Sequence, residues 1–186
     1  HSFSRRQRQM CIRDRPIIDP DSRFHPVFSS LGMVVSQERI ASEVGAAILK
    51  KGGNAIDAAV ATGFSLAVTL PRAGNLGGGG FMVIHLAESG ETITIDYREM
   101  APSAATTDMF LDTSGEVDNK KARYSIYSSG IPGTVAGLLH AHERFGKLSL
   151  AEIIQPAIDL ATNGIEVSID LSSSLATRRA CLLYTS

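Results

Sequence analysis

The chain has little cysteine, few acidic residues near its ends and no long apolar segment. Only two of its 186 residues are cysteine, Cys11 and Cys181, and they lie in the terminal runs 1–15 and 178–186. Between these runs, disulfides, thiol catalysis and cysteine-based zinc sites are therefore excluded. No apolar run approaches the roughly 20 residues needed to cross a bilayer. No signal peptide is visible, but the first residue is not methionine, as expected of a piece cut from a longer frame, so secretion stays open.

The two terminal runs differ from the body in charge. They hold seven of the eighteen basic residues and one of the nineteen acidic residues, so residues 16–177 carry a net charge of −7. Both runs resemble translated sequencing-adapter read-through, and we expect 1–15 and 178–186 to be non-native ends. The alternatives are an arginine-rich arm that binds nucleic acid and a disulfide between the terminal cysteines. An acidic body offers no basic patch to continue such an arm, so we expect no nucleic-acid partner.

The body opens with an apolar segment and a predicted amphipathic helix. The apolar run MVV at residues 33–35 predicts a short strand. Ser36 is a suitable N-cap for the helix, which is expected to end at Gly52 after a basic last turn. The predicted apolar face comprises Ile40, Val44, Ala47 and Ile48. With 44% apolar and 20% charged residues, the composition is that of an ordinary soluble globular protein.

The second predicted helix, residues 55–70, is apolar nearly all round. Asn54 and Asp57 have capping-box spacing at its start, and Pro71 cannot continue it. A helix with no polar face is buried inside something larger. We therefore expect other elements to cover this helix on most sides.

The centre of the chain, residues 70–102, combines a glycine-dense turn with two predicted strands. The glycines of 77–80 let the backbone adopt positive φ or pass close to a neighbour. Residues 81–84 (FMVI) are continuously apolar, which is typical of a strand covered on both faces. Residues 92–97 (TITIDY) alternate as a half-buried strand does, and the turn residues of 88–91 join the two strands as a hairpin.

The rest of the body is predicted to be mainly helical. We expect a short helix at 106–111, a polar surface loop at 112–121, helices at 134–145 and 150–163, and a last helix capped by Ser168. Gly146 is expected to end the helix at 134–145. Ser149 and Glu152 have capping-box spacing at the start of the next helix, and Gly164 closes it. Two helices, a hairpin and several more helices, with no βαβ alternation, indicate an α+β fold with helices stacked on an antiparallel sheet.

Arg98 is the main candidate binding residue, because it lies where the second predicted strand gives way to loop. A guanidinium is a planar fork of donors that can form two parallel hydrogen bonds to a carboxylate. The alternative is a surface or inter-element salt bridge, for example with Glu99. From the residues alone both interpretations stay open, and the salt bridge is the more common outcome.

Two other patterns receive structural interpretations. The run 77–80 follows a helix and opens a strand, which is the reverse of a dinucleotide-binding turn, and no Lys-Ser/Thr pair follows it. Close backbone packing is therefore expected there. His140 and His142 are two residues apart on a helix and face different directions, while His85 has no partner histidine at ligand spacing. We therefore assign no metal.

Several motifs occur in one collinear order between residues 32 and 169. They are GMVVSQERIASEVGAAILKKGGNAIDAAVA, NLGGGGF, IDYREMAP, SSGIPGTVAGLLHAHERFG and IIQPAIDLATNGI. Together they resemble the γ-glutamyltransferase (γ-glutamyl transpeptidase) family. On this resemblance, residues 16–177 are the N-terminal part of the family's large subunit. The implied fold is part of a four-layer αββα sandwich of the N-terminal-nucleophile hydrolase type.

The resemblance also implies an activity. Enzymes of this family cleave γ-glutamyl amides such as glutathione and transfer the γ-glutamyl group to amino acids, peptides or water through a threonine ester. Arg98 occupies the position whose arginine holds the α-carboxylate of the γ-glutamyl group, and Glu99 beside it would orient it. The nucleophilic threonine lies C-terminal to anything present here, so no catalytic residue is assigned and the chain alone is expected to be inactive. Thr134 after Gly133 mimics a cleavage site, but its place at a helix start indicates a cap residue.

The implied partners are glutathione or another γ-glutamyl compound, and the small subunit that self-cleavage of the same precursor produces. No cofactor is implied, and the family suggests a periplasmic or secreted protein. Two alternatives stay open. One is a β-lactam (cephalosporin or glutaryl) acylase of the same superfamily, and the other is a non-catalytic amino-acid-binding homologue.

Overall fold

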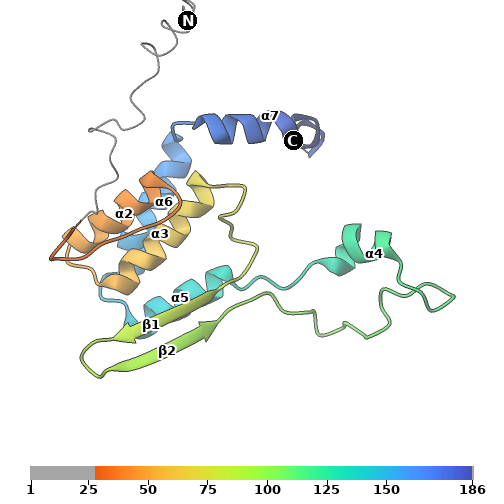
Figure 1. The fold of residues 1–186 in the computed structure, drawn as a ribbon, viewed down its shortest axis with the longest axis horizontal. Helices are drawn as coiled ribbons and strands as arrows, with labels where there is room; N and C mark the ends of the chain where they lie inside the picture. Colours follow the sequence, from red (N-terminus) through yellow and green to blue (C-terminus); the bar gives the residue numbers. More distant parts are fainter. Residues whose placement is uncertain (1–27, 186) are drawn as a thin grey trace, which may run out of the picture. The chain divides into compact units, whose positions relative to one another are not determined.

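A computed structural model describes residues 28–185 of the chain. The chain divides into two units, residues 1–31 and 32–186, and the described part of the first is an exposed loop at 28–31. Figure 1 shows the elements of the second unit. In chain order they are α2 (Arg39–Lys50), α3 (Ala55–Thr69), β1 (Phe81–Leu86), β2 (Glu91–Asp96), α4 (Asn119–Tyr124), the 3₁₀ turn η2 (Ile126–Ser128), α5 (Thr134–Phe145), α6 (Leu150–Asn163) and α7 (Ile169–Thr185).

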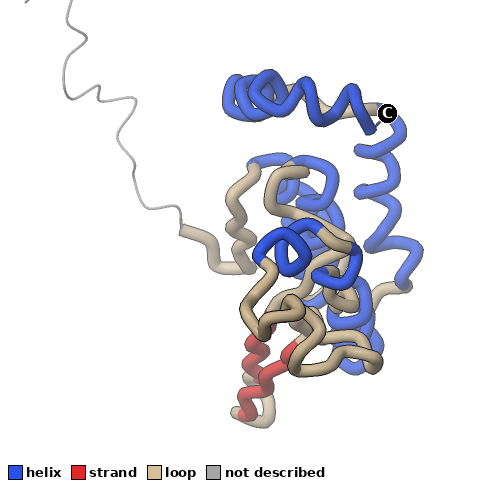
Figure 2. The backbone as a smooth tube through the Cα atoms, turned by 90° about the vertical axis from the view of Figure 1, so that its right-hand side faces the viewer, coloured by secondary structure: helices blue, strands red, loops and turns tan. Residues whose placement is uncertain are grey.

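Helix α3 is the centre of this unit, because α2, α5 and α6 all contact it. Figures 1 and 2 show the hairpin of β1 and β2 at the edge of this helical group. The buried residues of α3 are Asp57, Ala58, Val60, Ala61, Thr62, Phe64, Ser65 and Thr69. Their positions lie on several faces of the helix, which confirms that this apolar segment is covered nearly all round. The core around it contains Ile48, Leu138, Ile153 and Ala157 from the neighbouring helices.

Most predicted helix ends are confirmed. Helix α2 ends in a Schellman motif, in which Gly52 has φ +93° and the Gly53 N–H donates to the Ile48 carbonyl at 3.1 Å. The Asn54/Asp57 and Ser149/Glu152 pairs both form capping boxes. These local signals act within one turn, so no distant contact is needed to set them.

The start of α2 differs from the prediction. Glu38, not Ser36, is the N-cap, and the Ser36 hydroxyl instead bonds to Ser42 at 2.8 Å and accepts from the Glu38 N–H at 3.3 Å. The buried face is Ala41, Gly45 and Ile48, while Ala47 is exposed. Gly45 explains the shift, because a Cβ there would contact Val34 and Thr62, so α2 approaches α3 along its glycine.

Residues 33–35 do not form the predicted strand. Their backbone is irregular and pairs with no strand among residues 28–185. Val34 still packs against the core. Met33 and Val35 are 52% and 80% exposed, so the strand prediction for 33–35 is wrong and only Val34 contributes to the core.

The hairpin is confirmed as an antiparallel pair whose register places Phe81 opposite Asp96 and Ile84 opposite Ile93. Gly90, at φ +70°, supplies the turn. The expectation of a strand covered on both faces is wrong for the described residues. Ile84 is 4% exposed, but Phe81 and Val83, on the opposite face, are 64% and 70% exposed.

The segment between the hairpin and α5 is less helical at its start than predicted. Residues 106–111 form turns, because Thr and Asp side chains compete with helical bonds, and Leu111 pairs with Val117 across a loop. Asp112 holds that loop by accepting from the Ser114 and Glu116 N–H groups. Helix α4 begins inside the predicted loop, capped by Asp118.

The described architecture is mixed helix and strand, in agreement with the α+β prediction. Its sheet has two strands. Among residues 28–185, none of the helices combines the length and the apolar character of a transmembrane span. Helix α7, capped by Ser168 as predicted, is tied to the segment after α3 by an ion pair between Arg72 and Asp170 at 2.7 Å.

Candidate functional site

Arg98 lies two residues beyond the end of β2, as the sequence predicts. Its backbone N–H donates to the Asp96 side chain at 3.0 Å, which fixes the chain as it leaves the strand. Its side chain is 66% exposed. The residue therefore combines a hydrogen-bonded backbone with a solvent-accessible guanidinium.

Two glycine-containing segments pack against the backbone on either side of Arg98. A Cβ at Gly79 would lie 2.6 Å from the Tyr97 carbonyl oxygen and 2.7 Å from the Arg98 Cα. A Cβ at Gly133 would contact the same Tyr97 carbonyl group. Any side chain at either glycine would displace the strand end, so both are required for close approach.

The glycine run 77–80 is thus explained by packing, as predicted. Gly79 meets the backbone of residues 97–99, and Gly80 pairs with Tyr97 through an N–H to carbonyl bond in each direction, at 3.3 and 3.0 Å. None of the four has a positive φ. A Cβ added at Gly77 would meet nothing within 4 Å, so close packing explains the three glycines at 78–80 and not Gly77.

The residues after Arg98 are held by a backbone bridge. Met100 and Ile131 exchange N–H to carbonyl hydrogen bonds at 3.3 and 2.8 Å. A Cβ at Gly130 would lie 2.9 Å from the Glu99 Cβ, so this glycine lets the two segments meet. Glu99 is fixed in this way next to Arg98.

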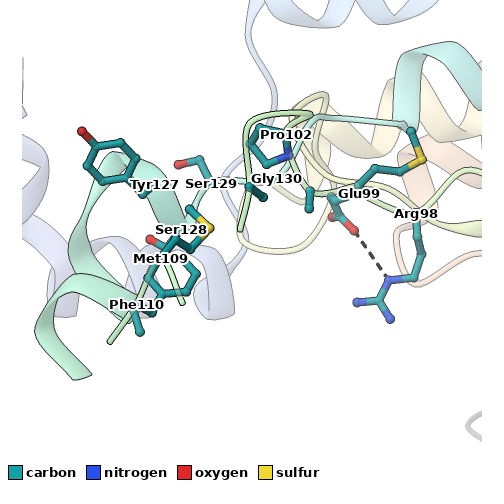
Figure 3. Close-up of a pocket in the computed structure, with 13 residues that line it drawn as sticks. Arg98, Glu99, Pro102, Met109, Phe110, Tyr127, Ser128, Ser129 and Gly130 are labelled. Carbon is teal, nitrogen blue, oxygen red and sulfur yellow. Dashed lines mark ion pairs between the residues drawn. The ribbon is translucent and has the colours of Figure 1, made fainter. Parts of the chain in front are cut away.

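The ion pair between Arg98 and Glu99, allowed by the sequence, is present. The Arg98 Nε lies 3.7 Å from the Glu99 Oε2, and the side chains are 66% and 37% exposed (Figure 3). Exposed pairs of this kind contribute little to stability. Because the contact is made through Nε, it does not occupy the two terminal nitrogens that form a carboxylate-binding fork.

A hollow of about 450 Å³ extends from this ion pair. Figure 3 shows Arg98 and Glu99 at one end and Tyr127, Met109 and Phe110 at the other. Ser128, Ser129 and Gly130 also line it. One end is therefore charged and the other is apolar and aromatic, an arrangement that suits a small molecule with a carboxylate.

Arg98 also borders a second hollow of about 460 Å³, together with Asp96, Tyr97 and His140. Burial raises the pKa of the Tyr97 hydroxyl. The Tyr97 ring packs against Gly137 of α5 and Gly80, which anchors the strand end to that helix. Tyr97 is therefore neutral near pH 7 and acts here as a packing residue.

Two of the histidines within residues 28–185 are held by hydrogen bonds. Within residues 28–185, no group of three or more His, Cys, Asp or Glu side chains has metal-binding geometry. His85 is hydrogen-bonded to Thr92 at 3.1 Å, as expected of a strand histidine without a histidine partner. The His142 Nε2 lies 2.9 Å from the Leu148 carbonyl oxygen. Since a carbonyl only accepts, this nitrogen carries the proton.

Thr134 is not a cap residue. Gly133 is the N-cap of α5, and Thr134 is the first helical residue, with its hydroxyl 3.1 Å from the Asn75 Oδ1. Cys181 lies exposed in α7. Cys11 lies outside the described residues, so the terminal disulfide stays untested.

Gly130 and Gly133, whose close contacts lie around Arg98, and Asn75, which bonds to Gly78 and Thr134, are not singled out by the sequence. The GIPG segment at 130–133 was a usable signal, because two glycines around a proline just before a helix indicate a backbone that must approach another. Its partner could not be named without the fold.

Comparison with known proteins decides the family. The gamma-glutamyltranspeptidase family model matches residues 41–185. The chain belongs to the gamma-glutamyltranspeptidase family. The "Glutathione hydrolase proenzyme" of Escherichia coli (strain K12) is 53% identical over 154 residues, which are 83% of this chain and 26% of that relative. The crystal structure of the Helicobacter pylori gamma-glutamyltranspeptidase matches with a TM-score of 0.78 and 46% identity, over 84% of this chain and 44% of that one.

A second kind of relative is also similar. The "Acylase ACY 1 proenzyme" of Pseudomonas sp. (strain V22) is 41% identical over 163 residues, which are 84% of this chain and 29% of that relative. The chain thus spans about a quarter of the length of the curated relatives it matches. These matches confirm the family resemblance of the motifs.

Proposed function

We propose that the complete protein containing this chain hydrolyses γ-glutamyl amides such as glutathione and transfers the γ-glutamyl group to amino acids, peptides or water. The position of Arg98 is the observation that carries this proposal. It combines a fixed backbone with an exposed guanidinium at the edge of a hollow. The family membership and the 53% identity to a glutathione hydrolase proenzyme support it.

In this mechanism Arg98 binds the α-carboxylate of the γ-glutamyl group through its two terminal nitrogens. Glu99, 3.7 Å from Nε, holds the guanidinium plane in orientation. The nucleophile is a threonine of the small subunit, released by self-cleavage of the precursor, and its α-amino group serves as base. The threonine oxygen bonds to the carbonyl carbon while the C–N bond breaks, and the hydroxyl proton passes through the α-amino group to the leaving amine. Water or an amino acid then attacks the ester, which releases the acyl group and returns a proton to the threonine oxygen.

The same proposal covers the fold and location of the complete protein. The outer face of the hairpin, with Phe81 and Val83 at 64% and 70% exposure, would pack against a second sheet in a four-layer αββα sandwich. The rest of the precursor, including the small subunit, would supply that sheet. A periplasmic or secreted location follows from the family.

Kinetics of the complete protein test the role of Arg98. We expect Arg98→Gln to raise KM for a γ-glutamyl anilide by about a hundredfold, since charge-assisted hydrogen bonds contribute about 1.5–3 kcal/mol each. Arg72→Gln is the matched control, because Arg72 is also an exposed, ion-paired arginine. Unchanged KM in Arg98→Gln would overturn the proposed carboxylate contact.

A second candidate is cleavage of glutaryl amides by a cephalosporin-type acylase, and the 41% identity to an acylase proenzyme supports it. Glutaryl and γ-glutamyl groups share the distal carboxylate and differ in the α-ammonium, so Arg98 would serve either one. The ratio of kcat/KM for a γ-glutamyl anilide over a glutaryl anilide separates the two. We expect the γ-glutamyl compound to be preferred, and a glutaryl preference would support the acylase.

A further inference from the structure

The glycine segment that packs on Arg98 is held by one side chain, that of Asn75. The Asn75 Oδ1 accepts a hydrogen bond from the Gly78 N–H at 2.6 Å and another from the Thr134 hydroxyl at 3.1 Å. The Asn75 Nδ2 donates to the Ala73 carbonyl at 3.1 Å. Because that carbonyl requires a donor and the Gly78 N–H requires an acceptor, the amide can adopt only one of its two orientations.

The same junction continues through the backbone. The Gly78 carbonyl accepts from the N–H groups of Gly133 and Thr134 at 2.8 and 3.0 Å. Asn75 and Gly78 therefore join the glycine run to the start of α5. Gly79, which follows Gly78, and Gly133, which precedes Thr134, both pack on the strand end at Tyr97 and Arg98.

We propose that Asn75 and Thr134 form a positioning pair that determines the position of the Arg98 guanidinium. Neither side chain needs to touch substrate. Their shared hydrogen bond closes the glycine run against α5, and this closed junction fixes the backbone from which Arg98 extends. This inference rests on the proposed role of Arg98 as the carboxylate-binding residue.

A displaced Arg98 should weaken recognition of the α-carboxylate and spare the chemistry. Removing a contact that is equally strong in ground and transition states raises KM and leaves kcat unchanged. A suitable readout is the carboxylate preference, defined as kcat/KM for a γ-glutamyl anilide divided by kcat/KM for a 4-aminobutyryl anilide, which lacks the α-carboxylate. Loss of folded enzyme lowers both values and cancels in this ratio.

In the complete protein we expect Asn75→Ala to lower the carboxylate preference about tenfold, mainly through KM, because misplacement by a fraction of an ångström is costly at a bidentate site. Asn75→Asp keeps an acceptor for Gly78 and Thr134 and should retain most of the preference. Thr134→Val removes one donor and should give a smaller loss. The double variant Asn75→Ala/Thr134→Val should match Asn75→Ala alone, because the two residues act through one bond.

Asn163→Ala, at the exposed end of α6, is the control and should leave the preference unchanged. If Arg98→Gln abolishes the preference but Asn75→Ala and Thr134→Val leave it intact, the positioning pair is overturned and the role of Arg98 stands. If Arg98→Gln itself leaves the preference intact, the proposed function fails first. If Asn75→Ala does not fold, Thr134→Val decides alone, and an unchanged ratio there rejects the inference.

Discussion

Asp57 offers a sharp test of how the helical group is held together. Its carboxylate is fully buried and accepts from three backbone N–H groups. The Asn54 N–H donates at 3.0 Å, the Lys147 N–H reaches both oxygens at 3.0 and 3.1 Å, and the Leu148 N–H donates at 3.2 Å. One side chain thus caps α3 and also ties it to the loop between α5 and α6, 90 residues away.

Replacing Asp57 with Ala removes the acceptor for all three donors. A backbone amide left without its partner costs about 1–3 kcal/mol when buried, and the lower figure applies where water can enter. Lys147 is exposed and Asn54 and Leu148 are half-buried. Counting about 1 kcal/mol for each amide gives a loss of about 3 kcal/mol in the free energy that keeps this joint closed.

Hydrogen exchange in the complete protein measures this opening locally. A loss of about 3 kcal/mol corresponds to about a hundredfold faster exchange in the peptide containing residues 147 and 148, if exchange follows local opening. Glu152→Gln is the matched control, since Ser149 and Glu152 form the same capping box at an exposed helix start. That variant should leave exchange at 147–148 close to wild type.

Two results would contradict this account. A wild-type exchange rate at residues 147–148 in Asp57→Ala would mean that water replaces the carboxylate at no cost. Equal acceleration by Glu152→Gln would mean that capping at α6, not the buried carboxylate, holds the loop. Asp57→Asn adds a further check, because its amide keeps one acceptor oxygen and should give an intermediate rate.

Two further predictions concern pH and isolation of the body. Hydrogen bonds from the Ser149 hydroxyl and N–H lower the pKa of Glu152 below its ordinary value near 4.5. The ionised carboxylate therefore contributes its full stability above pH 4.5, and this contribution is lost as the pH falls through the lowered pKa. The thermal midpoint of wild type should fall more steeply on acidification than that of Glu152→Gln, and parallel curves would refute this. Isolated residues 16–177 leave Phe81 and Val83 exposed, so this fragment should aggregate or melt without a sharp transition, and a cooperative, reversible melt of a monomer would refute this. The same fragment should not turn over a γ-glutamyl anilide, and measurable turnover would refute that expectation.

The features that the sequence predicts well are those set by neighbours along the chain. The capping boxes of Asn54/Asp57 and Ser149/Glu152 need only one turn of helix, and the left-handed glycine at 52 needs only the end of α2. The alternation of apolar and polar residues over 92–97 likewise predicted correctly that Ile93, Ile95 and Tyr97 share the less exposed face of the hairpin. The place of Arg98 just after the second strand was predicted in the same way, whereas its binding role rests on the family resemblance and stays a prediction.

The features that the sequence misses depend on contacts between distant segments. Residues 106–111 are an exception, because Thr and Asp side chains within this segment favour turns over the predicted helix. Ala47 belongs to the apolar stripe of its helix, yet the close approach at Gly45 turns a different face toward α3. No local pattern could reveal that Gly79 and Gly133 meet at the same carbonyl of Tyr97.

The arrangement around Arg98 separates two tasks that a binding residue must fulfil. Gly79, Gly133 and the Met100–Ile131 bridge fix the backbone, and residues 28–185 provide all of these contacts. The guanidinium, at 66% exposure, pairs with the Glu99 carboxylate, which is 37% exposed, and an ion pair in water contributes about 0–1 kcal/mol. Strong binding of a carboxylate requires that water be excluded and that further donors converge on it. On the proposed function, this chain would orient the arginine of the carboxylate site, and the rest of the complete protein would supply the further donors and exclude the water.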